Sequence, residues 1–113
     1  MANTFVNKKV DLTSTSATTL YTVPSATTAV IKSILVSEDS GNADTITITL
    51  TDTDAAVFSL FKVKSISANG TSELLSAPLI AEESEIIKVT AATANRLHVV
   101  LSALETKPRV VTS

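Results

Sequence analysis

Residues 45–51 read Thr-Ile-Thr-Ile-Thr-Leu-Thr, so hydroxyl and aliphatic side chains alternate at every position. Successive side chains of a β-strand point to opposite faces of its sheet, so the aliphatic residues share one face and the threonines the other. Threonine and isoleucine are β-branched and favour extended backbone, which agrees with the pattern. The segment therefore predicts a half-buried strand of an antiparallel sheet.

Further extended segments follow along the chain, and turn residues separate them at intervals of roughly 8–12 residues. Asn69-Gly70 is the strongest two-residue turn signal, and residues 38–43 and 93–95 have the composition of hairpin loops. Residues 52–54 form another predicted turn. The segments that we expect to be extended are residues 4–10, 19–23, 29–37, 45–51, 57–66, 73–75, 79–80, 86–91 and 96–104.

This organisation predicts an all-β fold, either an antiparallel β-sandwich or a jelly roll of seven to eight strands. A chain of 113 residues is long enough for one such core, so we expect a single domain over residues 1–113. Residues 1–10 are either its first strand or an N-terminal arm, and residues 105–113 are expected to form a C-terminal tail. A short helix at residues 81–85 is the competing prediction for that segment.

Composition argues against several classes of function. The formal net charge is −2 and the basic residues are spread along the chain, whereas nucleic-acid binders need clustered cations to neutralise phosphates. The lack of cysteine removes disulfides, thiolate metal sites and thiol nucleophiles. No apolar run approaches the ~18 residues of a membrane span, and no signal-peptide pattern is visible. We expect no nucleic-acid partner, no membrane partner and synthesis in the cytoplasm.

Surface composition points instead to contact with protein. Charged residues make up 18% of the chain, against about 25% in an average soluble domain. By simple alternation, segments 29–37 and 96–104 are apolar on both faces, and a second subunit could cover the surplus face. Residues 3–5 and 107–111 are candidate arms, and they are either disordered or add a strand to a neighbour's sheet. The candidate interface residues are Ile31, Leu35, His98, Val100, Leu104, Arg109 and Val110.

Segment 57–66 departs from strict alternation at Leu60-Phe61, which predicts a β-bulge. The large apolar side chains of this segment are expected to join the core whichever way the bulge forms. These core candidates are Phe58, Leu60, Phe61 and Val63.

His98 is the single histidine, so no second histidine is present to complete a zinc site. Ser102 shares its strand face, but no oxyanion-loop motif accompanies the pair. An interface or partly exposed histidine is the favoured interpretation, and we expect no enzymatic activity. Residues 39–44 concentrate oxygen ligands as calcium sites do, but they also have the composition of an ordinary turn, so a cation site stays the alternative. We expect no cofactor.

The order of several segments resembles that of small bacteriophage virion proteins. The resemblance covers most of the chain after residue 17, and the order and spacing of the segments carry it. The segments are Leu20-Tyr21-Thr22-Val23-Pro24-Ser25, residues 28–34, residues 45–51, Ile66-Ser67-Ala68-Asn69-Gly70-Thr71, residues 79–89 and Leu97-His98-Val99-Val100-Leu101-Ser102.

The resemblance implies a β-sandwich or jelly-roll component of a phage particle, with a capsid decoration (cement) protein as the leading expectation. Its partners would be copies of itself, as a trimer for example, and other virion proteins such as the major capsid protein. A neck, tail or fibre-associated structural protein is the alternative. A carbohydrate-binding module on a fibre is another, which requires Tyr21 and the 39–44 loop to cluster at the surface.

Overall fold

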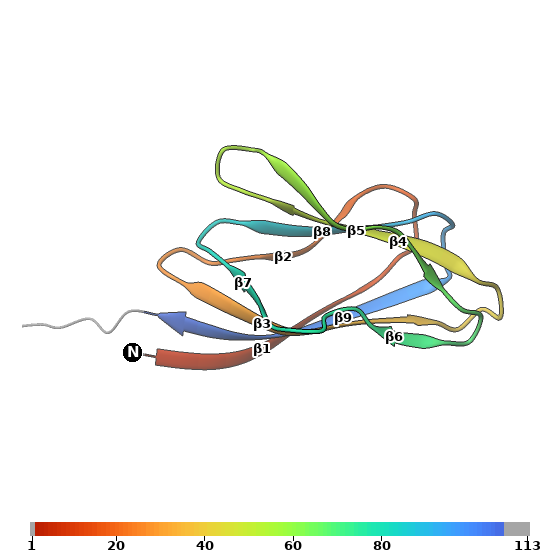
Figure 1. Ribbon diagram of the computed structural model, residues 1–113, viewed down its shortest axis with the longest axis horizontal. Coiled ribbons are helices and arrows are strands. Elements are labelled where there is room, and N and C mark those ends of the chain that lie inside the picture. The colour runs from red at the N-terminus through yellow and green to blue at the C-terminus, as the bar shows by residue number, and fades with distance from the viewer. Residues whose placement is uncertain (1, 108–113) are drawn as a thin grey trace, which may run out of the picture.

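A computed structural model describes residues 2–107 as two antiparallel sheets packed face to face (Figure 1). The prediction of an all-β sandwich is confirmed. The described residues contain no helix, so the helix considered at residues 81–85 is wrong, and a turn occupies its place. The strands are β1 (Ala2–Asp11), β2 (Thr18–Thr22), β3 (Thr28–Glu38), β4 (Asp44–Thr51), β5 (Val57–Ile66), β6 (Thr71–Glu73), β7 (Leu79–Ala81), β8 (Ile86–Ala91) and β9 (Leu97–Lys107).

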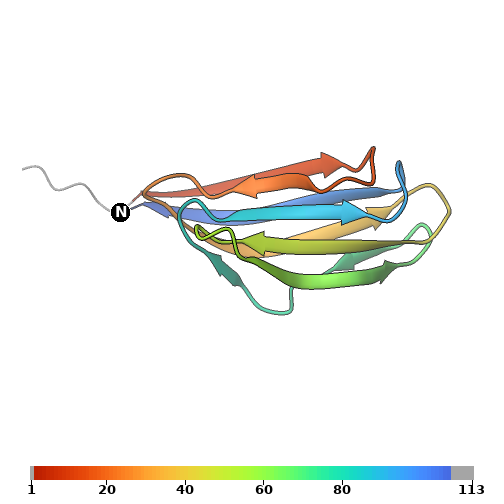
Figure 2. The ribbon, with the colours of Figure 1, turned by 90° about the horizontal axis from the view of Figure 1, so that it is seen from above.

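Sheet A has the order β1-β9-β3-β6, with β7 also paired to β3, and sheet B has the order β2-β8-β4-β5. Figure 2 shows that the strand axes of the two layers are nearly parallel to one another, which is the aligned packing of a sandwich. Within residues 2–107, β4 and β5 are the only consecutive strands that pair with each other. The hairpins predicted around residues 38–43 and 93–95 are therefore wrong. These loops lead from one sheet to the other. Turn composition predicts that the chain reverses direction, but it does not determine whether the two strands that the turn connects pair with each other.

The two long outer segments of the chain pair with each other. β1 pairs with β9 along its whole length, from Ala2 opposite Lys107 to Asp11 opposite His98. Of the two possibilities for residues 1–10, the structure therefore has the strand over the part that it describes, residues 2–10. β9 continues to Lys107, so residues 105–107 belong to a strand and not to a tail. The candidate interface residues Arg109 and Val110 lie outside the described residues.

A β-bulge in β3 changes which of its side chains face the core. The register against β9 shifts between Ile31 and Ser33. The extra residue reverses the alternation, so Ile31 and Ile34 both point inward and both are fully buried. The prediction of Ile31 as an interface residue is wrong for this reason. Leu35, on the other face, keeps 39% of its surface exposed.

β5 lies at the edge of sheet B, and its register against β4 shifts twice. One shift skips Leu60, which confirms the predicted bulge, and Leu60 and Phe61 pack against the core. The core prediction is wrong for Phe58 and Val63, which are 53% and 59% exposed, because an edge strand that bulges twice turns part of its apolar face to solvent. Val63 has φ of +53°, and its N–H donates to the Thr47 hydroxyl at 3.0 Å.

The core fills the space between the sheets with aliphatic side chains, as the low aromatic content requires. Alternation in β4 buries Ile46, Ile48 and Leu50 and leaves the threonines half-buried on the other face. The largest side chains that are fully buried are Leu12, Ile31, Ile34, Ile46, Ile48, Ile66, Ile87, Leu97 and Leu101. Residues 2–107 contain no helix that is long and apolar enough to span a membrane.

Glu38 ties together two of the connections between the sheets. Its side chain is buried at the end of β3. Oε1 accepts the N–H groups of Gly41 at 3.1 Å and Asn69 at 3.0 Å, while Oε2 accepts the Ser40 N–H at 2.6 Å. Burial acts to raise the pKa of Glu38, but hydrogen bonds from Ser40, Asn69 and Gly41 outweigh it and lower the pKa to about 2. The ionised carboxylate thus holds the β3–β4 and β5–β6 connections side by side.

Glu38→Gln is expected to flatten the acid dependence of stability. The folded pKa is lower than the ordinary value of 4.5. The ionised group therefore stabilises the fold fully above pH 4.5, and this contribution is lost as the pH falls through about 2. Urea unfolding between pH 7 and pH 2 measures the effect, with Glu82→Gln at an exposed turn position as control. A wild-type slope in Glu38→Gln would contradict this role.

Candidate functional site

The outer face of sheet A, which points away from sheet B, carries three of the large apolar side chains that are exposed among the described residues, namely Phe5, Leu35 and Ile80. Alternation in β9 turns His98, Val100, Ser102 and Leu104 to this face. Cross-strand pairing then places side chains of β1 on one side of them and of β3, β6 and β7 on the other. The face therefore consists of cross-strand rows that run from β1 through β9 to β3, and that continue to the far edge where β3 pairs with β6 or β7.

One row is apolar from edge to edge. Leu104 pairs with Phe5 on β1 and with Val30 on β3, and Val30 pairs with Ile80 on β7. Phe5 is 76% exposed and Ile80 is 53% exposed. Because neighbouring strands lie about 4.8 Å apart, these four side chains form one continuous band. A band of this kind costs free energy in water and is typical of a contact surface.

A second row has an apolar centre and charged ends. Val100 pairs with Lys9 on β1 and with Leu35 on β3, and Leu35 pairs with Glu73 on β6. Its two charges are opposite in sign and stand on opposite edges of the sheet. The charge distribution along the row is therefore asymmetric, with a cation at the β1 edge and an anion at the β6 edge.

Glu73 is held in place at its edge by local hydrogen bonds. It accepts the Ser33 hydroxyl, the Ile34 N–H at 2.9 Å and the Leu75 N–H at 3.2 Å. Burial acts to raise the pKa of Glu73, but these hydrogen bonds outweigh it and lower the pKa. Glu73 is therefore a fixed negative charge at neutral pH.

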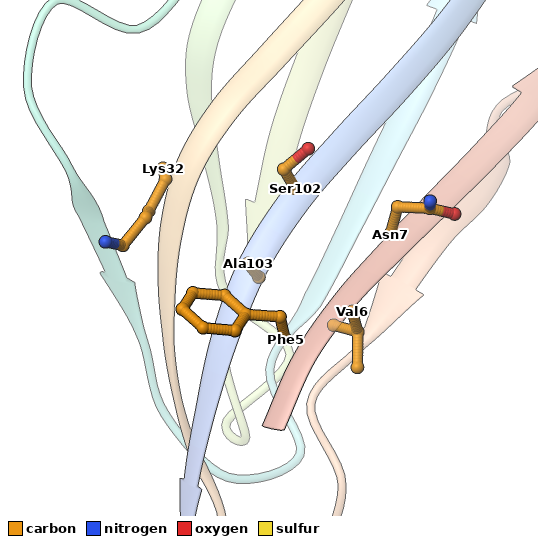
Figure 3. A pocket seen from close by; sticks show the side chains of 6 residues that line it. All are labelled: Phe5, Val6, Asn7, Lys32, Ser102 and Ala103. Carbon is orange, nitrogen blue, oxygen red and sulfur yellow. The ribbon is translucent and has the colours of Figure 1, made fainter. Parts of the chain in front are cut away.

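A shallow depression of about 280 Å³ lies between the apolar band and the polar row Asn7–Ser102–Ser33 beside it (Figure 3). The Phe5 ring lies across β9 above Ala103 and reaches toward Lys32 of β3. Lys32 Nζ is 5.8 Å from the ring centroid, which is within cation–π range. This contact holds the exposed ring against the sheet.

His98 stands at the far end of the same face between two carboxylates. Its Nε2 is 3.1 Å from Asp39 Oδ1, and its Nδ1 is 3.6 Å from Asp11 Oδ1. Ser102 is four residues away along an extended strand, about 13 Å, which is too far for a nucleophile–base pair. The carboxylates flank opposite ring nitrogens, so they orient the imidazole and leave no nitrogen aimed at Ser102.

The oxygen-rich loop at 39–44 uses its carboxylates within the fold. Asp39 faces His98, and Asp44 Oδ2 accepts the Thr93 N–H at 3.1 Å. Across residues 2–107, no group of three His, Asp or Glu side chains is placed to hold a metal ion. In the β4–β5 turn, which contains the turn predicted at residues 52–54, Asp52 accepts the N–H groups of Asp54 and Ala56, both at 2.9 Å.

The structure gathers Leu35, His98, Val100 and Leu104 of the candidate interface on this one face. Sequence reasoning missed the rest of the apolar band. Phe5 could have been found, because it shares a strand face with polar Asn7 and Lys9 and is the one aromatic there. The outward position of Val30 depends on the bulge, and Ile80 lies in a strand too short to show a period.

No protein-family model matches the chain, and no match was found among curated proteins.

Proposed function

We propose that the protein is a non-enzymatic structural subunit of a bacteriophage particle, most specifically a capsid decoration protein, that acts through the outer face of sheet A. The observation that carries the proposal is the apolar band Phe5–Leu104–Val30–Ile80, in which Phe5 and Ile80 are exposed. The face would bind other subunits of the particle, including copies of this chain. Added contacts between neighbouring subunits raise the barrier to rupture of a shell without any covalent step.

Energetics support a contact role for this face. Covering an exposed large aliphatic or aromatic side chain contributes roughly 1.5–3 kcal/mol. The band has two such side chains, Phe5 and Ile80, and half-buried Leu104 and Val30 lie between them. With Val100 and Leu35 on the same face, it provides a hydrophobic centre of the kind found in specific interfaces. Repetition of one contact around a particle multiplies the effect through avidity.

The strand order supports the same proposal by analogy. β6 and β7 pair with the same strand, β3, and can be counted as two pieces of one strand. The sheets then have the orders 1-8-3-6 and 2-7-4-5 over eight strands, which we infer to be a jelly roll. Jelly rolls recur in viral capsid proteins and also in lectins, so the fold narrows the function without deciding it.

The sugar-binding alternative needs Tyr21 at the surface beside the 39–44 loop. Tyr21 is 2% exposed, and its hydroxyl donates to Glu105 inside the sandwich. The aromatic side chain that this alternative requires at the surface, to stack against a sugar ring, is therefore part of the core. No observation in the described structure favours this alternative over the structural subunit.

Leu104→Asp is expected to weaken self-association and binding to shells that lack the protein by more than about tenfold, equivalent to about 1.4 kcal/mol. The reason is that a charge would enter the centre of the apolar band. Light scattering at micromolar concentration and co-sedimentation with such shells measure the two effects. Thr49→Asp is the matched control, since Thr49 is half-buried on the outer face of a central strand of sheet B. A wild-type protein that is monomeric and ignores these shells would overturn the proposal.

A further inference from the structure

We propose that two copies of this chain pair through the outer face of sheet A, about a two-fold axis parallel to its strands. In this arrangement Lys9 of each copy meets Glu73 of the other. The inference rests on the proposed function, because it takes the same face as the contact surface, and it adds the partner and the register. The occupant is a second copy of the chain.

Charge complementarity carries the inference. The row Lys9–Val100–Leu35–Glu73 is positive at the β1 edge and negative at the β6 edge. A two-fold axis along the strands, midway across the face, exchanges these edges between the copies. Each lysine then faces a carboxylate, and Val100 faces Leu35. An isologous contact of this kind forms both ion pairs at once.

The apolar row, two rows away along the strands, fits the same operation. Exchange of the edges places Phe5 of one copy opposite Ile80 of the other, and Leu104 opposite Val30. Every pair in this row is therefore apolar on both sides. Aligned packing keeps the strand directions of two stacked sheets within about 30°, so both rows stay close to register.

The other face-to-face axis, across the strands, gives a poorer match. If it passes through the charged row, Lys9 meets Lys9 and Glu73 meets Glu73. If it passes midway between the charged row and the apolar row, Lys9 lies against Phe5 and Glu73 lies against Ile80. Either result leaves both Lys9 and Glu73 without a counter-charge at the contact, which opposes association.

The size of the face sets the expected strength. Four strands about 4.8 Å apart and five cross-strand rows about 6.7 Å apart give a planar area of roughly 600 Å² per copy. The sum for two copies is about 1,200 Å², at the lower end of specific interfaces. We therefore expect a dimer that forms in the micromolar range.

Carbodiimide coupling tests the register without changing the sequence. The reagent joins an amine and a carboxylate that are in contact, with net loss of one water. A mixture of ¹⁴N- and ¹⁵N-labelled protein is coupled, digested and analysed by mass spectrometry. The expected product is a mixed-isotope peptide pair joined between Lys9 and Glu73. Lys9→Arg is the matched control, because arginine keeps the charge but forms no stable amide, so that product should fall to background.

The outcomes separate the register from the proposed function. A mixed-isotope Lys9–Glu73 product that is lost in Lys9→Arg supports the two-fold pairing. A dimer by light scattering that is weakened by Leu104→Asp but gives mixed-isotope products at other pairs would overturn the register and keep the contact face. A protein that stays monomeric at high micromolar concentration and gives no mixed-isotope product would overturn the pairing, and binding to shells would then decide the proposed function separately.

Discussion

Replacing Ile31 by alanine is expected to lower the free energy of unfolding by about 2–5 kcal/mol, the usual cost of truncating a fully buried isoleucine. Ile31 has no exposed surface, because the bulge in β3 turns it into the core beside Ile34. Urea unfolding of dilute protein, below the concentration at which copies associate, measures the change.

Leu35→Ala is the matched control for this prediction. It removes a side chain of the same size from the same strand, but one that points outward and is 39% exposed. We expect the free energy of unfolding to fall by less than about 1 kcal/mol, since little packing is lost. Equal losses in the two variants would show that Ile31 is not turned inward and that the bulge is absent.

Tyr21→Phe is expected to lower the free energy of unfolding by about 1.5–3 kcal/mol, the range for a hydrogen bond to a charged group. The Tyr21 hydroxyl on β2 donates to Glu105 Oε2 on β9 at 2.5 Å, and both residues are at most 8% exposed. The bond therefore joins the two sheets, and its loss strands a carboxylate in the core. A double-mutant cycle with Glu105→Gln isolates the coupling energy. A coupling energy near zero would contradict this role.

Alkaline titration tests the same bond independently. Burial, followed by the hydrogen bond to Glu105 and the charge of Glu105, raises the pKa of Tyr21 well above 10. The folded state therefore keeps this proton when the unfolded state has lost it, and stability falls as the pH rises above 10. Tyr21 is the single tyrosine, so its ionisation can be followed directly by ultraviolet absorbance. The phenolate signal should appear only as the protein unfolds.

Local pattern was sufficient where a strand has regular alternation. The repeat at residues 45–51 predicted β4 and its buried face, and the same reasoning separated the two faces of β9. Turn composition placed most strand ends correctly. Pattern failed at Ile31, Phe58 and Val63, because one extra residue in a strand reverses every later side chain and an edge strand has no neighbour to cover it.

The sequence by itself determined that this chain makes antiparallel strands with few charges, because β-branched residues at a period of two dictate both backbone and burial. The tertiary structure alone decided which strands pair, which loops cross between the sheets and which apolar side chains stay exposed. These depend on contacts between residues far apart in the chain. For example, the Thr106 hydroxyl on β9 donates to the carbonyl oxygen of Thr28 on β3, 78 residues earlier. The contact face exists for the same reason, since Phe5, Leu104, Val30 and Ile80 become one surface only when β1, β9, β3 and β7 lie side by side.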